Sequence, residues 1–401
     1  MYLMCISCGR EFERDTLIYT CSSCGDLLDV VVEPKSLFRR DTLQGRVDSM
    51  WRYKELLPSF DKGLVTLGEG YTRLVECKKL AKWIGVRSLY LKLDGLNPTG
   101  SFKDRGMSVG TSTALRLRMK RVICASTGNT SASLSAYSAR AGLECIVIIP
   151  REKVAVGKLF QARLFNSKVF QMVGGFDDAM TVVLKCAQAL DAYILNSINP
   201  WRLEGQKTTA YEIWEQLGRT DIAVAVPVGN CGNISAIWKG FKELGIHGVI
   251  KDLPIMIGAQ AEGAAPLVEY WEKGLETIRP WKNPETIATA IRIGNPVNWK
   301  KAVRALRESK GLITAVSDDD VVKALRAMSS LEGLAGEPSS AVAIAASKKL
   351  VDEGRIDPDT TLVSVVTGNP LKDTSDYLIS WNEPVKITDA NEIIGYFSRQ
   401  K

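Results

Sequence analysis

The sequence predicts an α/β protein built on parallel sheets. From Val65 onward, short apolar runs alternate with segments of helical periodicity. This repeated β-α order is typical of parallel sheets that are covered by helices on both faces. A chain of 401 residues, 45% of them hydrophobic, exceeds the usual size of one core, so we expect at least two domains.

The expected elements alternate along the chain. Apolar runs bounded by turn residues predict strands at 89–93, 121–125, 145–149, 168–172, 193–195, 222–228, 254–258 and 361–366. Helical periodicity predicts helices between them, for instance at 158–164, 179–190, 209–217 and 319–330. Residues 34–70 are polar and irregular, and we expect them to form a linker region.

Composition argues against several classes of function. The chain has 52 Lys and Arg against 45 Asp and Glu, a net charge of +7, without the block of like charge that marks a nucleic-acid-binding tail. No window approaches the roughly 20 consecutive apolar residues that span a bilayer, and the N-terminus lacks the apolar core of a signal peptide. We therefore expect a cytoplasmic protein that binds neither nucleic acid nor membrane.

One lysine lies in a setting that suits covalent chemistry. Residues 97–106 read Asn-Pro-Thr-Gly-Ser-Phe-Lys-Asp-Arg-Gly, so Lys103 follows a Gly-Ser turn and opens a helix. A lysine amine must be partly deprotonated to condense with a carbonyl group, and burial or a helix-end position lowers its pKa. Lys103 is therefore the candidate for a covalent cofactor link, although a lone lysine beside such a turn is usually a solvated surface charge.

Three further loops of small or polar residues follow expected strands. They are 126–130 (Ser-Thr-Gly-Asn-Thr), 229–233 (Gly-Asn-Cys-Gly-Asn) and 367–369 (Thr-Gly-Asn). The carboxyl end of a strand followed by a helix N-terminus suits a small anion, and the two glycines of 229–233 let the backbone approach a phosphate closely. Each loop alone is a common capped turn, but the four together indicate a binding site.

On these motifs the chain resembles the fold-type II pyridoxal phosphate enzymes, which are tryptophan synthase β-like in fold, and within them the threonine synthase branch. The resemblance runs from about Gly68 to Asp373 and also rests on 199–208, 258–264 and 287–296. It implies pyridoxal 5'-phosphate in a cleft between two parallel-sheet domains, and a homodimer. The expected large domain comprises 34–85 and 200–401, and the small domain 86–199.

The resemblance also implies roles for individual residues. Lys103 is expected to hold the cofactor as a Schiff base and to move protons at Cα and Cβ, since the single histidine, His247, is a poor candidate for this work. Asn129 is expected to contact the ring hydroxyl, and Thr367 the pyridine nitrogen. The expected cup for the cofactor phosphate consists of Gly229, Asn230, Cys231, Gly232 and Asn233.

The substrate implied by the resemblance is a small phosphorylated amino acid. Its carboxylate is expected at Ser126, Thr127 and Thr130, and its phosphate at Asn196, Ser197, Arg202 and Asn230. The alternative for Arg202 is a surface ion pair with Glu204 or Glu212. The implied reaction is that of a carbon–oxygen lyase, in which phosphate leaves Cγ of O-phospho-L-homoserine and water adds at Cβ to give L-threonine.

Four of the nine cysteines follow a metal-ligand pattern. Cys5-x-x-Cys8 and Cys21-x-x-Cys24, each followed by glycine and separated by twelve residues, have the spacing of a tetrahedral zinc site with four cysteine ligands. We expect a zinc-ribbon-like segment at 1–33, in which a structural zinc supplies much of the folding free energy. Paired disulfides and a ribbon that has lost its metal are the alternatives.

Two other functions stay open. Cysteate synthase, which takes O-phosphoserine and sulfite, resembles the threonine synthases closely. Asn369 and Pro370 stand where many relatives carry histidine and glycine, which puts the identity of the substrate in question. The third hypothesis is a catalytically silent paralogue that serves as a binding module, and the intact Lys103 and phosphate cup count against it.

Overall fold

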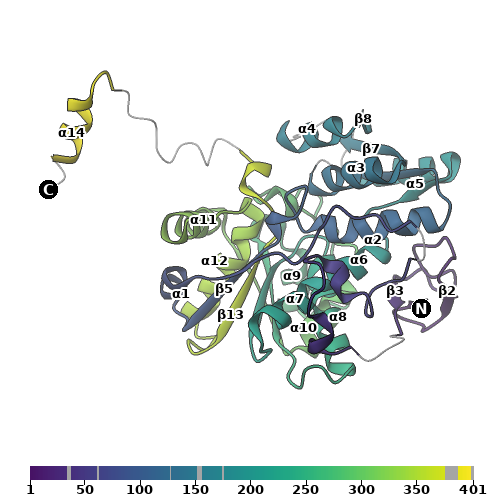
Figure 1. Ribbon diagram of the computed structural model, residues 1–401, viewed down its shortest axis with the longest axis horizontal. Coiled ribbons are helices and arrows are strands. Elements are labelled where there is room, and N and C mark those ends of the chain that lie inside the picture. The colour runs from purple at the N-terminus through teal and green to yellow at the C-terminus, as the bar shows by residue number, and fades with distance from the viewer. Residues whose placement is uncertain are drawn as a thin grey trace.

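The computed structural model describes residues 1–33, 38–60, 63–126, 128–150, 156–173, 176–374 and 387–398. These residues form two largely parallel sheets covered by helices, together with a small antiparallel sheet at the N-terminus (Figure 1). Within the described ranges, none of the helices has the length and hydropathy needed to traverse a bilayer. The α/β fold with parallel sheets is therefore confirmed.

The larger sheet has six strands in the order β12-β11-β10-β13-β5-β4. Their bounds are β4 Leu74–Glu76, β5 Ser88–Leu93, β10 Ala223–Pro227, β11 Ile255–Ala261, β12 Leu312–Val316 and β13 Thr361–Val366. All neighbouring pairs are parallel except β4 and β5. Every residue of the central strands β10 and β13 is buried, as expected for strands covered on both faces.

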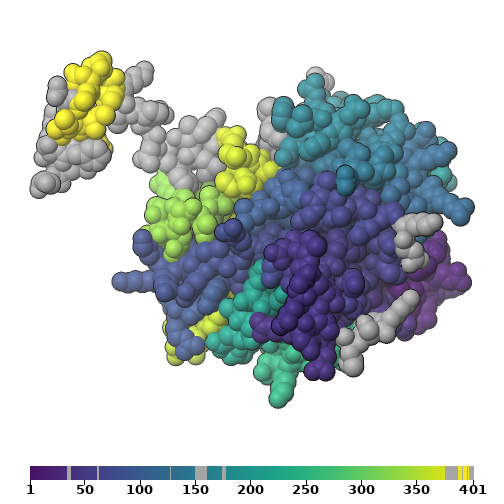
Figure 2. Space-filling model, viewed as in Figure 1, coloured from purple at the N-terminus to yellow at the C-terminus, as the bar shows by residue number. Residues whose placement is uncertain are grey.

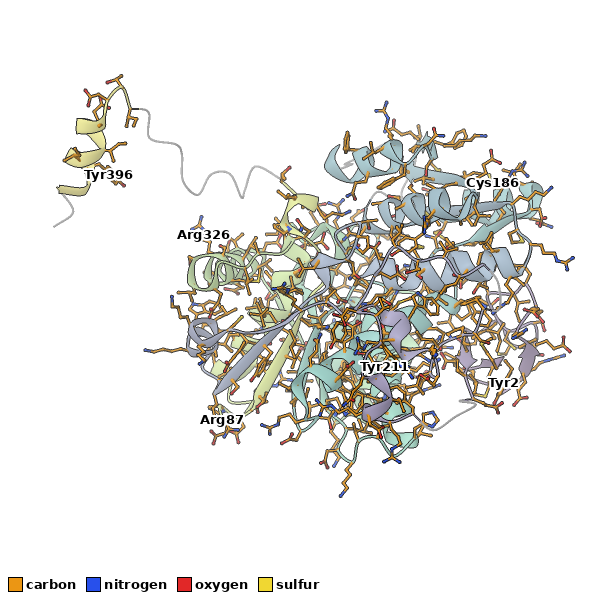
Figure 3. The ribbon with its side chains drawn as sticks, viewed as in Figure 1. Tyr2, Arg87, Cys186, Tyr211, Arg326 and Tyr396 are labelled. Carbon is orange, nitrogen blue, oxygen red and sulfur yellow. The ribbon has the colours of Figure 1, made fainter. Side chains whose placement is uncertain are left out.

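Helices cover both faces of this sheet because alternate residues of each strand point to opposite sides. On one face Val224 and Val226 pack with α7 (Thr208–Leu217), α8 (Gly232–Ile246) and α10 (Trp299–Glu308). On the other, Ala223 and Ala225 pack with α1 (Lys78–Ile84), α11 (Asp318–Glu332) and α12 (Pro338–Asp352). Tyr211 of α7 lies inside this lobe, whereas Arg326 of α11 lies at its outer edge (Figure 3).

The smaller sheet has four parallel strands in the order β8-β7-β6-β9. They are β6 Arg121–Ala125, β7 Glu144–Pro150, β8 Lys168–Met172 and β9 Ala192–Ile194. The helices of this unit are α2 Lys103–Arg116, α3 Asn129–Ala141, α4 Val156–Leu164 and α5 Phe176–Leu190. Strand β5 pairs in the larger sheet, although it lies within the range 86–199 expected for the small domain. The division into domains stays a prediction.

Short elements complete the described chain. The remaining helices are α6 Trp201–Gln206, α9 Pro266–Glu272 and α14 Ala390–Ser398. Single turns of 3-10 helix are η1 Arg40–Leu43, η2 Met50–Tyr53, η3 Asp94–Leu96, η4 Glu262–Ala264, η5 Thr289–Ile291 and η6 Pro370–Lys372.

The expected linker at 34–70 is irregular, but where it is described it is not a free connection. Phe38, Leu43, Met50, Tyr53 and Val65 are buried. Figure 2 shows residues 38–60, in dark purple, lying on the body of the protein. The prediction of a polar linker was wrong. Isolated apolar side chains in this segment pack against the rest of the protein, and isolated residues produce no helix or strand periodicity in the sequence.

The N-terminal sheet has the order β2-β1-β3, with β1 Tyr2–Cys5, β2 Glu11–Glu13 and β3 Leu28–Val31. Its strand β3 is fastened to α10. The Lys301 amine donates to the Leu28 carbonyl at 2.7 Å and pairs with Asp29 at 2.7 Å. On the opposite side, the Tyr19 hydroxyl accepts from the Ile194 backbone N–H of β9 at 2.7 Å. The ribbon therefore contacts both α10, which covers the larger sheet, and β9 of the smaller sheet.

A buried ionic cluster beside Lys103 joins α2 to β5 of the larger sheet and to α7. The Arg105 guanidinium of α2 pairs with Asp94 at 2.7 Å and with Glu212 of α7, and Lys92 of β5 pairs with Glu212 at 2.7 Å. All four side chains are fully buried. Burial would raise the pKa of Glu212, but Arg105 and Lys92 hold it at about 2. The cluster fixes the first turn of α2.

We expect Glu212→Gln to destabilise the protein by about 3–5 kcal/mol, because it leaves Arg105 and Lys92 buried without their shared counter-ion. The matched control is Glu353→Gln, at an exposed position after α12. Equilibrium unfolding in denaturant measures both. A loss below about 1 kcal/mol for Glu212→Gln would contradict the structural weight given to this cluster.

Candidate active site

Lys103 is held where two loops meet. The Phe102 backbone N–H donates to the Thr367 carbonyl at 3.0 Å, and the Asn369 N–H donates to the Gly100 carbonyl at 2.9 Å. Between these bonds, Ser101 forms a bridge with Gly368. The loop at 97–106 is thereby fastened to the carboxyl end of β13. Helix α2 begins at Lys103, as the sequence predicted.

The surroundings of Lys103 favour its neutral form. Its side chain is largely buried, with Nζ 4.2 Å from the centre of the Phe102 ring. Burial lowers the pKa of Lys103 to about 7; Arg202 acts in the same direction, and Glu337 acts against it. A substantial fraction of the amine is therefore unprotonated at neutral pH, which condensation with a carbonyl group requires.

The loop at 229–233, predicted as the phosphate cup, leads into the N-terminus of α8. Cys231 precedes the helix in the left-handed conformation (φ 65°), so that the following backbone N–H groups turn toward one point. A Cβ on Gly229 would lie 2.9 Å from Cα of Ile291, so this position admits only glycine. The buried amide of Asn233 has no partner among the described residues. This donor set fits a phosphate group.

One pocket brings these groups together. It is lined by Phe102, Lys103, Ser197, Arg202, Leu203, Gln206, Pro227, Gly229, Asn230, Cys231, Gly232, Asn233, Ala290, Ile291, Asn298, Glu337 and Thr367. Most of the residues that the sequence predicted for the cofactor and for the substrate phosphate are among them. The single histidine, His247, lies at the far end of α8.

Arg202 of α6 is buried with unused donors. Its side chain is 2% exposed, and Nε and Nη2 have no partner within the described chain. The alternative of a surface ion pair is wrong, since Glu204 pairs with Lys207 and Glu212 pairs with Arg105. Burial lowers the pKa of Arg202 to about 10, which leaves it cationic at neutral pH. A buried cation without a counter-ion indicates a site for an anionic ligand.

The other predicted residues are placed unevenly. Thr367 immediately follows β13, with its hydroxyl 3.2 Å from that of Ser340. Asn129 is buried and reaches the pocket through Glu337. The side-chain amide of Asn196 is hydrogen-bonded to the backbone of Ala125. Its Oδ1 accepts from the Ala125 N–H at 3.0 Å, and its Nδ2 donates to the Ala125 carbonyl at 2.8 Å. Ser126, on the loop after β6, and Thr130, in the first turn of α3, are not part of the pocket lining, and Thr127 lies outside the described residues.

Sequence reasoning missed three polar residues of the pocket lining, Gln206, Asn298 and Glu337. Glu337 immediately precedes α12. Gln206 lies one helical turn after Arg202, and that spacing was a usable signal. Asn298 donates through Nδ2 to the Ser197 carbonyl at 3.0 Å, and its backbone N–H donates to the Asn230 carbonyl at 3.1 Å. Its place depends on tertiary contacts that no local pattern shows.

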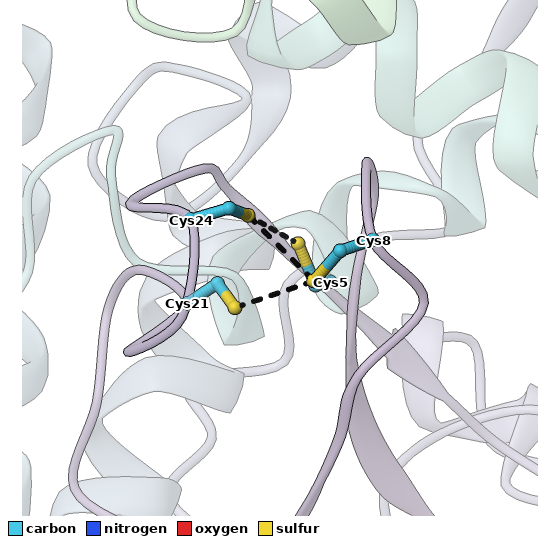
Figure 4. Close-up of side chains that lie close together, drawn as sticks. All are labelled: Cys5, Cys8, Cys21 and Cys24. Carbon is cyan, nitrogen blue, oxygen red and sulfur yellow. Dashed lines mark hydrogen bonds between the residues drawn. The ribbon is translucent and has the colours of Figure 1, made fainter.

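The four N-terminal cysteines form a separate cluster, in which the thiols of Cys5, Cys8, Cys21 and Cys24 face one another (Figure 4). All are free, and their sulfur atoms lie within 4.8 Å of one another, with close pairs at 3.4, 3.6 and 3.7 Å. A tetrahedral ion with metal–sulfur bonds of about 2.3 Å sets sulfurs about 3.8 Å apart. The arrangement of the four thiols therefore fits such an ion. The four cysteines form no disulfide bonds with one another, which was the alternative.

Comparison with known proteins agrees with this geometry. Residues 65–368 match the model of the family described as pyridoxal-phosphate dependent enzyme. The chain belongs to the pyridoxal-phosphate-dependent enzymes. Two curated members are similar over nearly the whole length: the threonine synthase of Methanocaldococcus jannaschii is 51% identical, covering 96% of both chains, and that of Methanosarcina acetivorans is 48% identical, covering 97% of this chain and 96% of the relative.

Solved structures place the chain in the fold-type II class of this family. Threonine synthase from Escherichia coli matches with a TM-score of 0.75 and 18% identity, over 97% of this chain and 93% of that one. Threonine deaminase isoform 2 from Solanum lycopersicum matches with a TM-score of 0.68 and 23% identity, over 88% and 97%. These likenesses establish the fold.

We expect Arg202→Met to weaken binding of inorganic phosphate by roughly tenfold to a hundredfold, because charge-assisted hydrogen bonds contribute about 1.5–3 kcal/mol. Isothermal titration of the holoenzyme with phosphate measures this loss. The matched control, Arg326→Met on the exposed face of α11, should leave the affinity unchanged. Equal affinities of Arg202→Met and the wild type would remove Arg202 from the anion site.

Proposed function

We infer that the protein is a threonine synthase, which converts O-phospho-L-homoserine and water into L-threonine and inorganic phosphate. The observation that carries this conclusion is a single pocket that holds a largely buried lysine, a backbone cup for one phosphate and a buried arginine with unused donors for a second anion. Curated threonine synthases at 46–51% identity over most of the chain support it.

When bound, pyridoxal phosphate supplies the electron sink that makes protons at the substrate's Cα and Cβ removable. We propose that Lys103, whose burial favours a neutral amine, takes and returns these protons. The cup of Gly229, Asn230, Cys231, Gly232 and Asn233 would hold the cofactor phosphate, and Thr367 would face the ring nitrogen. Because a hydroxyl is neutral, it does not enforce a protonated ring, which favours elimination and replacement over transamination.

The substrate would be held at the other side of the pocket. We propose that Arg202 and Ser197, with Asn230, bind its phosphate, and that Asn196 supports this group by holding the backbone of Ala125. Its carboxylate would lie at the loop of Ser126, Thr127 and Thr130. An arginine with hydroxyl and amide donors suits a phosphate dianion, and its burial excludes water from the leaving group.

We expect Lys103→Ala to reduce formation of threonine from O-phospho-L-homoserine at least a thousandfold, since the proton-transferring amine is lost. Circular dichroism should show an unchanged fold. The control Lys82→Ala alters a lysine of α1 away from the pocket and should keep the activity. Near-wild-type turnover by Lys103→Ala would exclude this lysine from the chemistry.

The same assay tests the alternative substrate. Incubation with O-phosphoserine and sulfite should give no cysteate, whereas O-phospho-L-homoserine alone should give threonine. Cysteate as the main product would replace the proposed function with cysteate synthase. Absence of both products in cofactor-loaded protein would favour the silent paralogue.

We propose further that the N-terminal cluster of four cysteines binds one structural zinc ion. Four thiolates at tetrahedral spacing are a preferred zinc ligand set, and Gly9 and Gly25 turn the backbone after each pair with φ of 71° and 73°. The ribbon contributes only a few apolar side chains, among them Leu3, Leu28 and Val30, to a core that it shares with the smaller unit, so the ion would contribute much of its stability. The ion pair between Asp29 of the ribbon and Lys301 would then help to hold α10 in place. The N-cap residue of α10, Asn298, lines the pocket.

We expect about one zinc per chain by elemental analysis of the wild type. Cys21→Ser should lose the metal and lower the unfolding temperature, because a tetrahedral site needs all four ligands. Cys186→Ser, at a half-buried position of α5, is the matched control and should keep the metal. A full zinc content in Cys21→Ser would contradict the assignment of the ligands.

We also propose that the enzyme is a homodimer located in the cytoplasm. The family resemblance supports the dimer, and the composition of the chain supports the location. Light scattering at several protein concentrations would measure the oligomeric state.

A further inference from the structure

Glu337 is a buried acidic residue of the pocket that the proposed chemistry has not used. It immediately precedes α12, its side chain is 1% exposed, and it lines the same pocket as Lys103 and Arg202. Its backbone N–H donates to the Gly368 carbonyl at 2.9 Å. Its side chain does not cap its own helix, although it occupies the N-cap position. Helix capping therefore does not explain the carboxylate.

The carboxylate fixes the amide of Asn129. Nδ2 of Asn129, in the first turn of α3, donates to Oε1 of Glu337 at 2.8 Å. Because a carboxylate only accepts hydrogen bonds, this contact determines which end of the amide faces Glu337. The second N–H of Nδ2 and Oδ1 are then left for another group, and Oδ1 has no partner in the described chain. The bond also joins α3 of the smaller unit to α12 of the larger.

The position of Glu337 also matters electrostatically. Among the described charged groups, those that act on the Lys103 amine are Arg202 of α6, which disfavours its protonation, and Glu337, which favours it. Burial disfavours the ammonium form as well, and the balance leaves the pKa of Lys103 at about 7. Within the described chain, Glu337 is thus the only negative side chain of the pocket lining that opposes burial and Arg202 at the Lys103 amine.

Gly368 is shaped to accommodate this carboxylate. A Cβ at Gly368 would lie 2.5 Å from Oε1 and 2.6 Å from Cδ of Glu337. Any other residue at this position would therefore push the carboxylate out of place. The requirement for glycine is independent of the charge argument and indicates that the location of Glu337 is tightly determined.

We propose that Glu337 is a positioning residue of the active site, whose carboxylate holds Asn129 in one orientation and balances the positive charge of the Lys103 amine. The inference deepens the proposed function and rests on it in taking Lys103 as the amine that links the cofactor. It assigns two separable tasks to one side chain, a hydrogen bond and a charge.

The charge is tested on the apoprotein, without turnover. Lys103 is labelled with an amine-selective acylating reagent across a pH series, and the modified peptide is quantified by mass spectrometry. Glu337→Gln should lower the pH of half-maximal labelling by roughly one unit, because an opposite charge is lost, and Arg202→Met should raise it. Glu353→Gln, the surface control, should not move it. A profile unchanged by Glu337→Gln would overturn the charge role.

The hydrogen bond is tested by titrating the apoprotein variants with pyridoxal phosphate. Glu337→Ala should weaken cofactor binding roughly tenfold, and Glu337→Gln should restore it, since the glutamine Oε1 still accepts from Asn129. Gly368→Ala, which displaces the carboxylate without changing its chemistry, should resemble Glu337→Ala in affinity. Wild-type affinity in both Glu337→Ala and Gly368→Ala would overturn the positioning role.

The outcome for the proposed function is read separately. If Lys103 in the wild type titrates near the ordinary value for lysine, about 10.4, the role of Lys103 fails and this inference fails with it. If Lys103 titrates near 7 in the wild type, the role of Lys103 stands. If the Glu337 variants then show the labelling profile and the cofactor affinity of the wild type, the assignment of Glu337 is wrong and the proposed function is unaffected.

Discussion

The removal of one lysine amine from water is the constraint on which the rest of the site depends. Lys103 must be neutral part of the time at neutral pH, and desolvation is the largest cause that lowers its pKa to about 7. Burial of a cationic group is costly, so it persists only where the surrounding structure holds it firmly. The backbone bonds from Phe102 to Thr367 and from Asn369 to Gly100 supply that hold, because they fasten the lysine loop to the end of β13.

The electrostatics of the pocket follow from that arrangement. Arg202 is buried beside the amine with unused donors, and the cup before α8 presents backbone N–H groups, so the pocket favours two anions. Glu337 is the acidic side chain of its lining. The cluster of Arg105, Asp94, Glu212 and Lys92 stabilises the opposite side of α2. Helix α2 thus contributes both to the active site, through Lys103, and to the stability of the fold, through Arg105.

Much of the fold was predictable because its signals are local. The expected strands 121–125, 168–172 and 361–366 coincide with β6, β8 and β13, whose apolar runs are bounded by turn residues. Strand β12 was missed although its sequence, Leu312–Val316, is a short apolar run between Gly311 and Ser317. The packing of Phe38 and Tyr53 was missed because isolated apolar side chains show no period. The lysine loop and the cup were found as motifs. Glu337 was not, since its contact with Asn129 joins residues 208 positions apart.

The most direct test of the account locates the cofactor's covalent bond. The protein is loaded with pyridoxal phosphate, reduced with borohydride so that the bond becomes permanent, digested, and analysed by mass spectrometry. The account predicts the pyridoxyl group on the peptide that contains Lys103 and on no other. A pyridoxyl group on a different lysine near the pocket, such as Lys207 or Lys372, with Lys103 unmodified, would contradict it.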